Sequence, residues 1–171
     1  MAYTAIDDPE AYFQVKLYTG TGSSLALTLD GDTDMQPDLV INKGRSGGSY
    51  SGEGHHVWDS VRGVTKYVYT QTTAAEDTDA EGLKSFDSDG FTLGTRGGSN
   101  GSSTLFVAWC WKESATAGFD IVTWTGNGSN RTISHNLSAV PHFMIVKQRS
   151  ATRDWATYTH ATGNGQYMNL N

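Results

Sequence analysis

An internal repeat is the feature that most constrains how this chain of 171 residues can fold. The stretch from Phe13 to Ser46 returns in altered form from Phe119 to Ser150. Each copy opens with a short run that alternates in polarity and then reaches a Gly-x-Gly turn. The two copies start 106 residues apart. A repeat with a period longer than about 50 residues indicates a duplicated folding unit rather than one turn of a solenoid.

The two copies differ in extent. The first copy continues to about Lys112, whereas Asn171, the last residue of the second copy, corresponds to a position near the middle of the first. We therefore predict a complete unit over residues 1–112 and a partial second copy over residues 113–171. The partial copy is expected either to pack on the first or to be completed by a partner chain, because an unfinished sandwich leaves open strand edges.

The composition predicts an all-β protein. Charged residues make up only 18% of the chain, aromatic residues make up 11%, and there are 20 glycines. Aromatic and β-branched residues suit pleated, half-buried strands, and glycines suit the turns between them. We predict an antiparallel β-sandwich of the jelly-roll or concanavalin-like type.

The strand-like runs carry more specific expectations. In Phe13–Tyr18 we expect Phe13, Val15 and Leu17 to point into the core, and we expect Leu25–Leu29 to alternate cleanly as well. Thr104–Lys112 is the most hydrophobic run and is predicted to be a central strand, buried on both faces, with Cys110 inside. The second copy is predicted to form strands at Phe119–Thr125, Arg131–Ser134, His142–Gln148 and Trp155–Thr159.

Charge and hydropathy argue against several classes of function. The net charge is −6, and no cluster of Lys and Arg offers the basic footprint of a nucleic-acid-binding protein. The sequence has no apolar run of about 18 residues, which a membrane-spanning helix would need, and the first 12 residues do not resemble a signal peptide. The single cysteine, Cys110, leaves no internal disulfide and suits a reducing cytoplasm.

Two short motifs have residue types that could bind a metal ion. Asp30, Asp32 and Asp34 have the alternate spacing of a calcium loop, but the sequence lacks the following Gly and the distal Glu. A solvated acidic loop is the favoured interpretation, also because the second copy keeps no acidic residue there. His55 and His56 are adjacent, so on a strand their side chains point to opposite faces and cannot share one ion. We predict no metal and no cofactor.

No pattern predicts catalysis. The Gly-x-Gly pairs at Gly20–Gly22 and Gly126–Gly128 precede no helix, so we interpret them as turns rather than as a dinucleotide loop. No Gly-x-Ser-x-Gly elbow is predicted to stand between a strand and a helix. Aromatic residues near the glycine-rich loops are candidates for contact with a protein partner or a glycan. They are Trp124, Trp155 and Tyr158, with Tyr50 and Tyr167. The alternative is that these rings cover the core.

Several blocks of the sequence resemble uncharacterised proteins of marine tailed bacteriophages, such as cyanophages and pelagiphages. The blocks include Gln36-Pro-Asp-Leu-Val40, Ser85-Phe-Asp-Ser-Asp-Gly-Phe-Thr-Leu-Gly94 and Val107-Ala-Trp-Cys-Trp-Lys112. In the second copy, Thr125-Gly-Asn-Gly128 and Val140-Pro141 carry the resemblance. It implies a concanavalin-like or laminin-G-like β-sandwich and gives no catalytic residues.

The resemblance also implies a role. The chain is expected to be a virion structural protein, as a decoration, fibre or tail component that binds other virion proteins, with no enzymatic activity. We further expect a homo-oligomer. The alternative is a lectin-like module that binds host-surface glycans through its loop aromatics.

Overall fold

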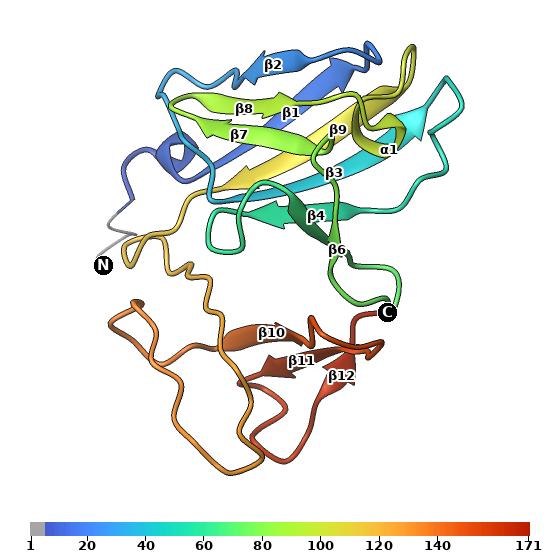
Figure 1. Cartoon of the computed structure of the whole chain (residues 1–171). Coiled ribbons are helices and arrows are strands. Elements are labelled where there is room, and N and C mark those ends of the chain that lie inside the picture. Colours follow the sequence, from blue (N-terminus) through green and yellow to red (C-terminus); the bar gives the residue numbers. More distant parts are fainter. Residues whose placement is uncertain (1–5) are drawn as a thin grey trace.

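The fold is an antiparallel β-sandwich, as the composition predicts. The computed structural model describes residues 6–171 and contains three sheets. The main sheet has the order β1 (Phe13–Thr19), β9 (Leu105–Trp111), β3 (Leu39–Ser46), β4 (His56–Asp59), β5 (Lys66–Tyr69) and β6 (Asp77–Thr78). A second sheet of β2 (Leu25–Thr28), β8 (Gly90–Leu93) and β7 (Leu83–Asp87) covers one face of it (Figure 1).

A third, smaller sheet lies apart from this sandwich. It has the order β10 (Phe143–Lys147), β11 (Trp155–Thr159) and β12 (Met168–Asn169), and forms the lower body in Figure 1. Two short helical segments complete the described residues, the 3-10 turn Pro9–Ala11 and α1 (Gly97–Asn100). Asp8 caps the 3-10 turn, since its Oδ1 accepts a hydrogen bond from the Glu10 backbone N–H at 3.0 Å.

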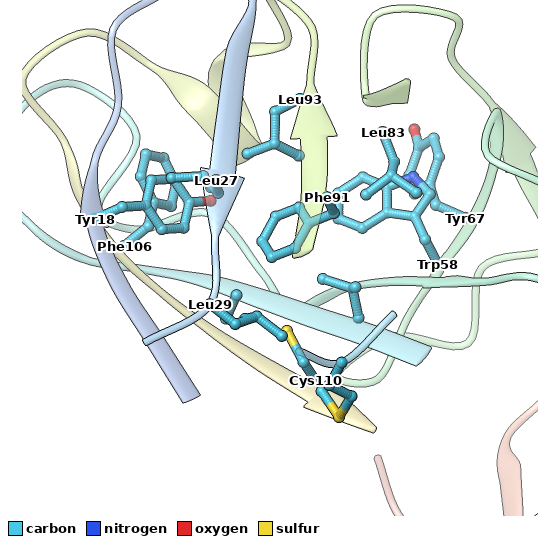
Figure 2. Packing of buried hydrophobic residues seen from close by; sticks show 13 residues of the cluster. Tyr18, Leu27, Leu29, Trp58, Tyr67, Leu83, Phe91, Leu93, Phe106 and Cys110 are labelled. Atoms are coloured by element: carbon cyan, nitrogen blue, oxygen red, sulfur yellow. The ribbon is translucent and has the colours of Figure 1, made fainter. Parts of the chain in front are cut away.

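The hydrophobic core lies between the six-stranded and three-stranded sheets. Figure 2 shows Leu27, Phe91 and Leu93 of the smaller sheet beside Trp58 and other residues of the larger one. Burying each such side chain contributes roughly 1.5–3 kcal/mol. The prediction for Leu25–Leu29 is confirmed, because Leu27 and Leu29 are buried and the residues between and beside them are exposed.

The strand β9 is central, and its residue Cys110 is fully buried, as predicted. Burial raises the pKa of the Cys110 thiol to about 12, so the group stays protonated and chemically inert in the folded protein. The expectation that β9 is buried on both faces is only partly right. Trp109 and Trp111 are half-buried, and Leu105 is exposed, because no sheet formed by residues 6–171 packs on that face of β9.

The predicted orientation of β1 is wrong. Phe13, Val15 and Leu17 point away from the core and are 39%, 42% and 57% exposed, whereas Gln14 and Tyr18 are buried. The buried polar groups are satisfied locally. The Gln14 amide donates to the Thr33 carbonyl at 3.0 Å and accepts from the Gly31 N–H at 2.8 Å, and the Tyr18 hydroxyl donates to the Ser99 carbonyl at 2.6 Å. Buried polar side chains with such partners carry little penalty.

The small sheet repeats part of the large one residue by residue. In the first copy, Leu39 pairs with Asp59 across β3 and β4, and in the second Phe143 pairs with Thr159 across β10 and β11. The next pair of strands agrees as well. His56 pairs with Tyr69 across β4 and β5, and the equivalent residues Ala156 and Asn169 pair across β11 and β12. The strands β10, β11 and β12 are therefore the counterparts of β3, β4 and β5.

Even side-chain details recur. Lys43 Nζ donates to the carbonyls of Gly44 at 2.8 Å and Glu53 at 2.6 Å. Its counterpart Lys147 donates to the carbonyls of Gln148 at 2.9 Å and Arg153 at 3.0 Å. The same lysine thus closes the turn after the equivalent strand in both copies.

Two predicted strands of the second copy are not formed. Phe119–Thr125 contributes only an isolated bridge, from Phe119 to Ser114, and Arg131–Ser134 has no strand. The physical reason lies in the first copy, where β1 pairs with β9 alone. Residues 113–171 contain no counterpart of β9, so the stretch equivalent to β1 has no ladder to join.

The second copy packs on the first through Trp155. This side chain is only 8% exposed and packs against Val57 and Val68 on the uncovered face of the main sheet. Its indole N–H donates to the Tyr69 carbonyl at 2.8 Å. The expectation that Trp155 is an exposed ring is therefore wrong, because this face of the main sheet offers apolar surface to bury it.

Backbone hydrogen bonds reinforce this contact. The loop after β5 meets the loop after β10, where Glu76 N–H donates to the Arg149 carbonyl at 2.8 Å and Arg153 N–H to the Thr73 carbonyl at 2.9 Å. Glu76 also lies 3.5 Å from Arg149 Nη1. The two copies are thus joined by one apolar anchor and a short polar seam.

Candidate interaction surface

The main sheet carries an apolar surface on the side away from its core. It is formed by alternate residues of β1 and β9, and we call it the outer apolar face: Phe13, Val15, Leu17, Leu105, Val107, Trp109 and Trp111. The strand register sets them side by side, with Phe13 opposite Trp111, Val15 opposite Trp109 and Leu17 opposite Val107. The Phe13 and Trp111 rings lie 4.9 Å apart. Val107 is buried, whereas the other six side chains are half-buried or exposed. Exposed apolar surface of this kind typically marks an interaction site.

An open pocket lies where this face meets the second copy. Its volume is about 500 Å³, and its walls include Trp109, Trp111, His55 and Ile41 from the main sheet and Leu170 from the C-terminal segment. Thr70 and Gln71 supply polar groups at its edge. The combination of aromatic walls and a polar edge suits either a protein side chain or a sugar ring.

The three aromatic residues proposed as contacts do not come together. Trp155 is buried between the copies, and Tyr158, three residues further along β11, lies on the opposite face of that strand. The Tyr158 hydroxyl donates to Asn164 Oδ1 at 3.2 Å. Trp124 is 43% exposed in a stretch without regular structure. Of the two further rings, Tyr50 is 38% and Tyr167 is 70% exposed.

The structure shows where the acidic loop Asp30–Asp34 and the pair His55 and His56 lie. Asp30 forms an ion pair with Lys16, and the side chains of Asp30, Asp32 and Asp34 are exposed. Across residues 6–171, no group of three or more His, Cys, Asp or Glu side chains gathers as metal ligands would. His55 and His56 point to opposite faces as predicted, since His55 stacks beside Trp109 and His56 stacks on Trp58 inside the core.

A polar cluster surrounds Arg96 at the end of the core near α1. Its Nε donates to His56 Nε2 at 3.3 Å, and its Nη2 donates to the hydroxyls of Tyr67 and Tyr69, each at 3.0 Å. Its Nη1 forms an ion pair with Asp79. Each guanidinium nitrogen thus has a partner inside the protein, so the cluster holds together the loops that Arg96 and Asp79 belong to.

His56 is neutral within this cluster. Burial, together with the positive charge of Arg96, lowers the pKa of His56 to about 3. Burial also raises the pKa of Tyr67, whose hydroxyl donates to Asp77 Oδ2 at 2.9 Å. A neutral imidazole can accept the Arg96 hydrogen bond, which a protonated one could not.

The sequence reasoning missed the outer apolar face because it assigned Phe13, Val15 and Leu17 to the core. One available signal was the run Leu105–Trp111, in which the residues that point to either face of the strand are apolar. Such a strand makes both faces of its sheet apolar, and only one of them can lie against the second layer. Among the described residues, no helix is long and apolar enough to cross a membrane.

Comparison with known proteins gives a family and no function. No curated protein and no solved structure matches the chain. One protein family, described as a domain of unknown function (DUF7483), matches residues 8–171. The match spans both copies of the repeat, including the outer apolar face and the small sheet. The chain therefore belongs to the DUF7483 family of domains of unknown function.

Proposed function

We propose that this chain is a virion structural protein of a tailed phage and that it works by binding neighbouring proteins through its outer apolar face. The single observation that carries the binding role is the exposure of that face. Leu17 is 57% exposed, and Val15 and Leu105 are 42% and 37% exposed, in one continuous patch. The virion context comes from the resemblance of the sequence to marine phage proteins.

The chemistry of the face favours a protein partner. Aromatic residues are enriched in protein interfaces and charged residues are depleted from their centres, and the face has Phe13, Trp109 and Trp111 with no charged residue among its members. A flat apolar patch gains free energy when another protein covers it, roughly 25 cal/mol for each Å² of apolar area removed from water. The half-exposed tryptophans are suited to be the anchors of such a contact.

The experiment compares incorporation of variants into particles. Tagged chain is expressed during infection by the phage that encodes it, and purified particles are analysed by quantitative mass spectrometry. We expect the wild-type chain in the particles and at least tenfold less of the double variant Val15→Ser, Leu17→Ser. The matched control is Ala26→Ser on β2, an exposed strand position outside the outer apolar face.

Thermal unfolding of the purified variants shows that each is folded, since surface substitutions usually change stability by less than about 0.5 kcal/mol. Absence of the wild-type chain from particles would overturn the virion role. Equal incorporation of the double variant and the control would overturn the role of the outer apolar face.

A second candidate function is glycan binding at the pocket beside Trp109. The specific observation in its favour is the aromatic lining next to the polar groups of Thr70 and Gln71. Sugar rings stack on such aromatic faces, and amide groups bind their hydroxyls. A glycan array should then give hits that the variant Trp109→Ala loses and the variant Trp124→Ala keeps. An array without hits excludes this function.

A further inference from the structure

Two histidines meet where strands β10 and β11 adjoin. His142 directly precedes β10 and His160 directly follows β11, so the antiparallel register sets them opposite each other, one position beyond Phe143 and Thr159. The His160 backbone N–H donates to the His142 carbonyl at 2.7 Å. The two imidazole rings stack, with their centroids 4.7 Å apart and their planes 17° from parallel. The strand register thus brings together two side chains that are distant in the sequence.

The first copy has a hydrogen-bonded pair of side chains at the same place. By the equivalence of the strands, Asp38 and Ser60 are the counterparts of His142 and His160. The backbone bond recurs, since the Ser60 N–H donates to the Asp38 carbonyl at 2.9 Å. The Ser60 hydroxyl also donates to Asp38 Oδ1 at 2.8 Å. In the first copy, this position therefore joins the ends of two neighbouring strands through their side chains.

The histidine pair has no such direct bond between its side chains. Both histidines are exposed, and no hydrogen bond joins either ring to another residue within the described range 6–171. A neutral imidazole carries one ring nitrogen with a lone pair, and this nitrogen is the commonest metal ligand that proteins offer. Two adjacent imidazoles therefore present two lone pairs that a single cation can satisfy together.

The spacing of the two rings suits one transition-metal ion. Zinc–nitrogen bonds are about 2.0–2.1 Å long, so two imidazole nitrogens that share one ion lie roughly 3–3.5 Å apart. Ring centroids at 4.7 Å allow this separation, and the exposed side chains can turn until one nitrogen of each ring meets the ion. Imidazole suits Zn²⁺, Ni²⁺ and Cu²⁺, whereas Ca²⁺ and Mg²⁺ prefer oxygen ligands. The ligand type thus selects the class of ion.

We propose that His142 and His160 bind a divalent transition-metal ion such as Zn²⁺ or Ni²⁺, and that the ion clamps the adjoining ends of β10 and β11. It takes the place of the hydrogen bond between Ser60 and Asp38 in the first copy. Two protein ligands leave further coordination positions for water. The expectation of no metal considered ligands that are close in sequence, whereas this pair is formed by strand register. The site lies outside the outer apolar face, so either proposal can fail without the other.

Calorimetric titration of the full chain with ZnCl₂ tests the site directly. We expect one ion per chain, and at least tenfold weaker binding after His142→Gln or His160→Gln, because each variant removes one of the two protein ligands. The matched control is His135→Gln, since His135 is also an exposed histidine of the second copy. This control should leave the affinity unchanged. MgCl₂ at the same concentrations should not bind, because Mg²⁺ prefers oxygen ligands.

Hydrogen exchange measures the clamp itself. Zn²⁺ should slow exchange of the β10 and β11 amides and leave that of the β2 amides unchanged. At a free ion concentration of 100 times Kd, the slowing should be about a hundredfold for amides that exchange only after the ion has left. The double variant His142→Asp, His160→Ser installs the pair of the first copy. Its β10 and β11 amides should exchange at the same rate with and without Zn²⁺, and their protection shows that the sheet is formed.

Four outcomes contradict the proposal. Wild-type chain that does not bind Zn²⁺ more tightly than the double variant has no site at this pair. Equal weakening by all three single variants would indicate an adventitious ion only, shared among surface histidines. One ion per two chains would place the ion between molecules rather than between strands. Binding of Zn²⁺ without slower exchange in β10 and β11 would show that the ion does not hold the strands together.

Discussion

The two copies of the β-meander are the same structure in two environments. In β3–β4–β5 the inward face is covered by the sheet β2–β8–β7, and in β10–β11–β12 nothing among the described residues takes that place. Tyr67, which faces that second layer, is 3% exposed, whereas its counterpart Tyr167 is 70% exposed. The strand pairing is equal in the two copies, so the difference lies in the second layer.

This difference teaches that the meander keeps its register without a covering layer. Turn chemistry and backbone pairing are local, as the recurrent lysine at Lys43 and Lys147 shows. Burial is not local, because it needs residues that come from distant parts of the chain or from a partner. The second copy is thus a formed sheet whose apolar surface remains available.

The largest expected effect comes from changing the same residue type in both copies. Tyr67→Ala removes a buried ring and its hydrogen bonds to Asp77 and Arg96, and should cost about 4 kcal/mol of the free energy of unfolding. Tyr167→Ala should cost less than about 0.5 kcal/mol, because the ring is exposed. Urea unfolding followed by tryptophan fluorescence measures both. Equal losses would show that the second copy is covered in solution.

A somewhat smaller effect is expected at the contact between the copies. Trp155→Ala removes the apolar anchor and the hydrogen bond to the Tyr69 carbonyl, and should destabilise the small sheet by roughly 3 kcal/mol. Hydrogen exchange should then speed up in β10–β12 and stay slow in β9. Trp124→Ala, at an exposed position, is the control and should change neither. Unaltered exchange in the Trp155 variant would mean that the polar seam alone holds the copies together.

The smallest effect concerns pH and a residue that the second copy lacks. His56 has a pKa of about 3 in the folded state, and Ala156 stands in its place in the second copy. Because the folded pKa lies below the unfolded value of 6.5, stability is full above pH 6.5 and falls as the pH drops towards 3. Between pH 7 and pH 5 this amounts to about 2 kcal/mol.

Urea titrations at a series of pH values measure this loss. His56→Gln should flatten the acid slope between pH 7 and pH 5, whereas His135→Gln, at an exposed position, should not. An unchanged slope in the His56 variant would show that other groups cause the acid sensitivity.

Much of the fold follows from patterns in the sequence. The repeat, the all-β class, the central place of Leu105–Trp111 and the opposed histidines can all be predicted from periodicity and composition. The strand expected at Phe119–Thr125 could not be rejected in this way. Its alternation matches that of β1, and only the missing partner strand prevents it from pairing.

The candidate site was less predictable than the fold. The alternation of Phe13 to Tyr18 defines two faces, but it does not say which face is covered. Hydrophobicity alone favours Phe13, Val15 and Leu17 as the core side. The structure reverses that choice because loop carbonyls and N–H groups satisfy Gln14, and the Ser99 carbonyl satisfies Tyr18.

By itself, the sequence determined the all-β class and the strands that recur in both copies, such as β3 and β4 in the first and β10 and β11 in the second. These properties depend on turns and on alternation over short distances. Only the tertiary structure decided which apolar surfaces are covered: Trp155 is buried, whereas Leu17 and β10 remain open. The physical reason is that burial depends on which sheet packs on which face, and no residue carries that information alone.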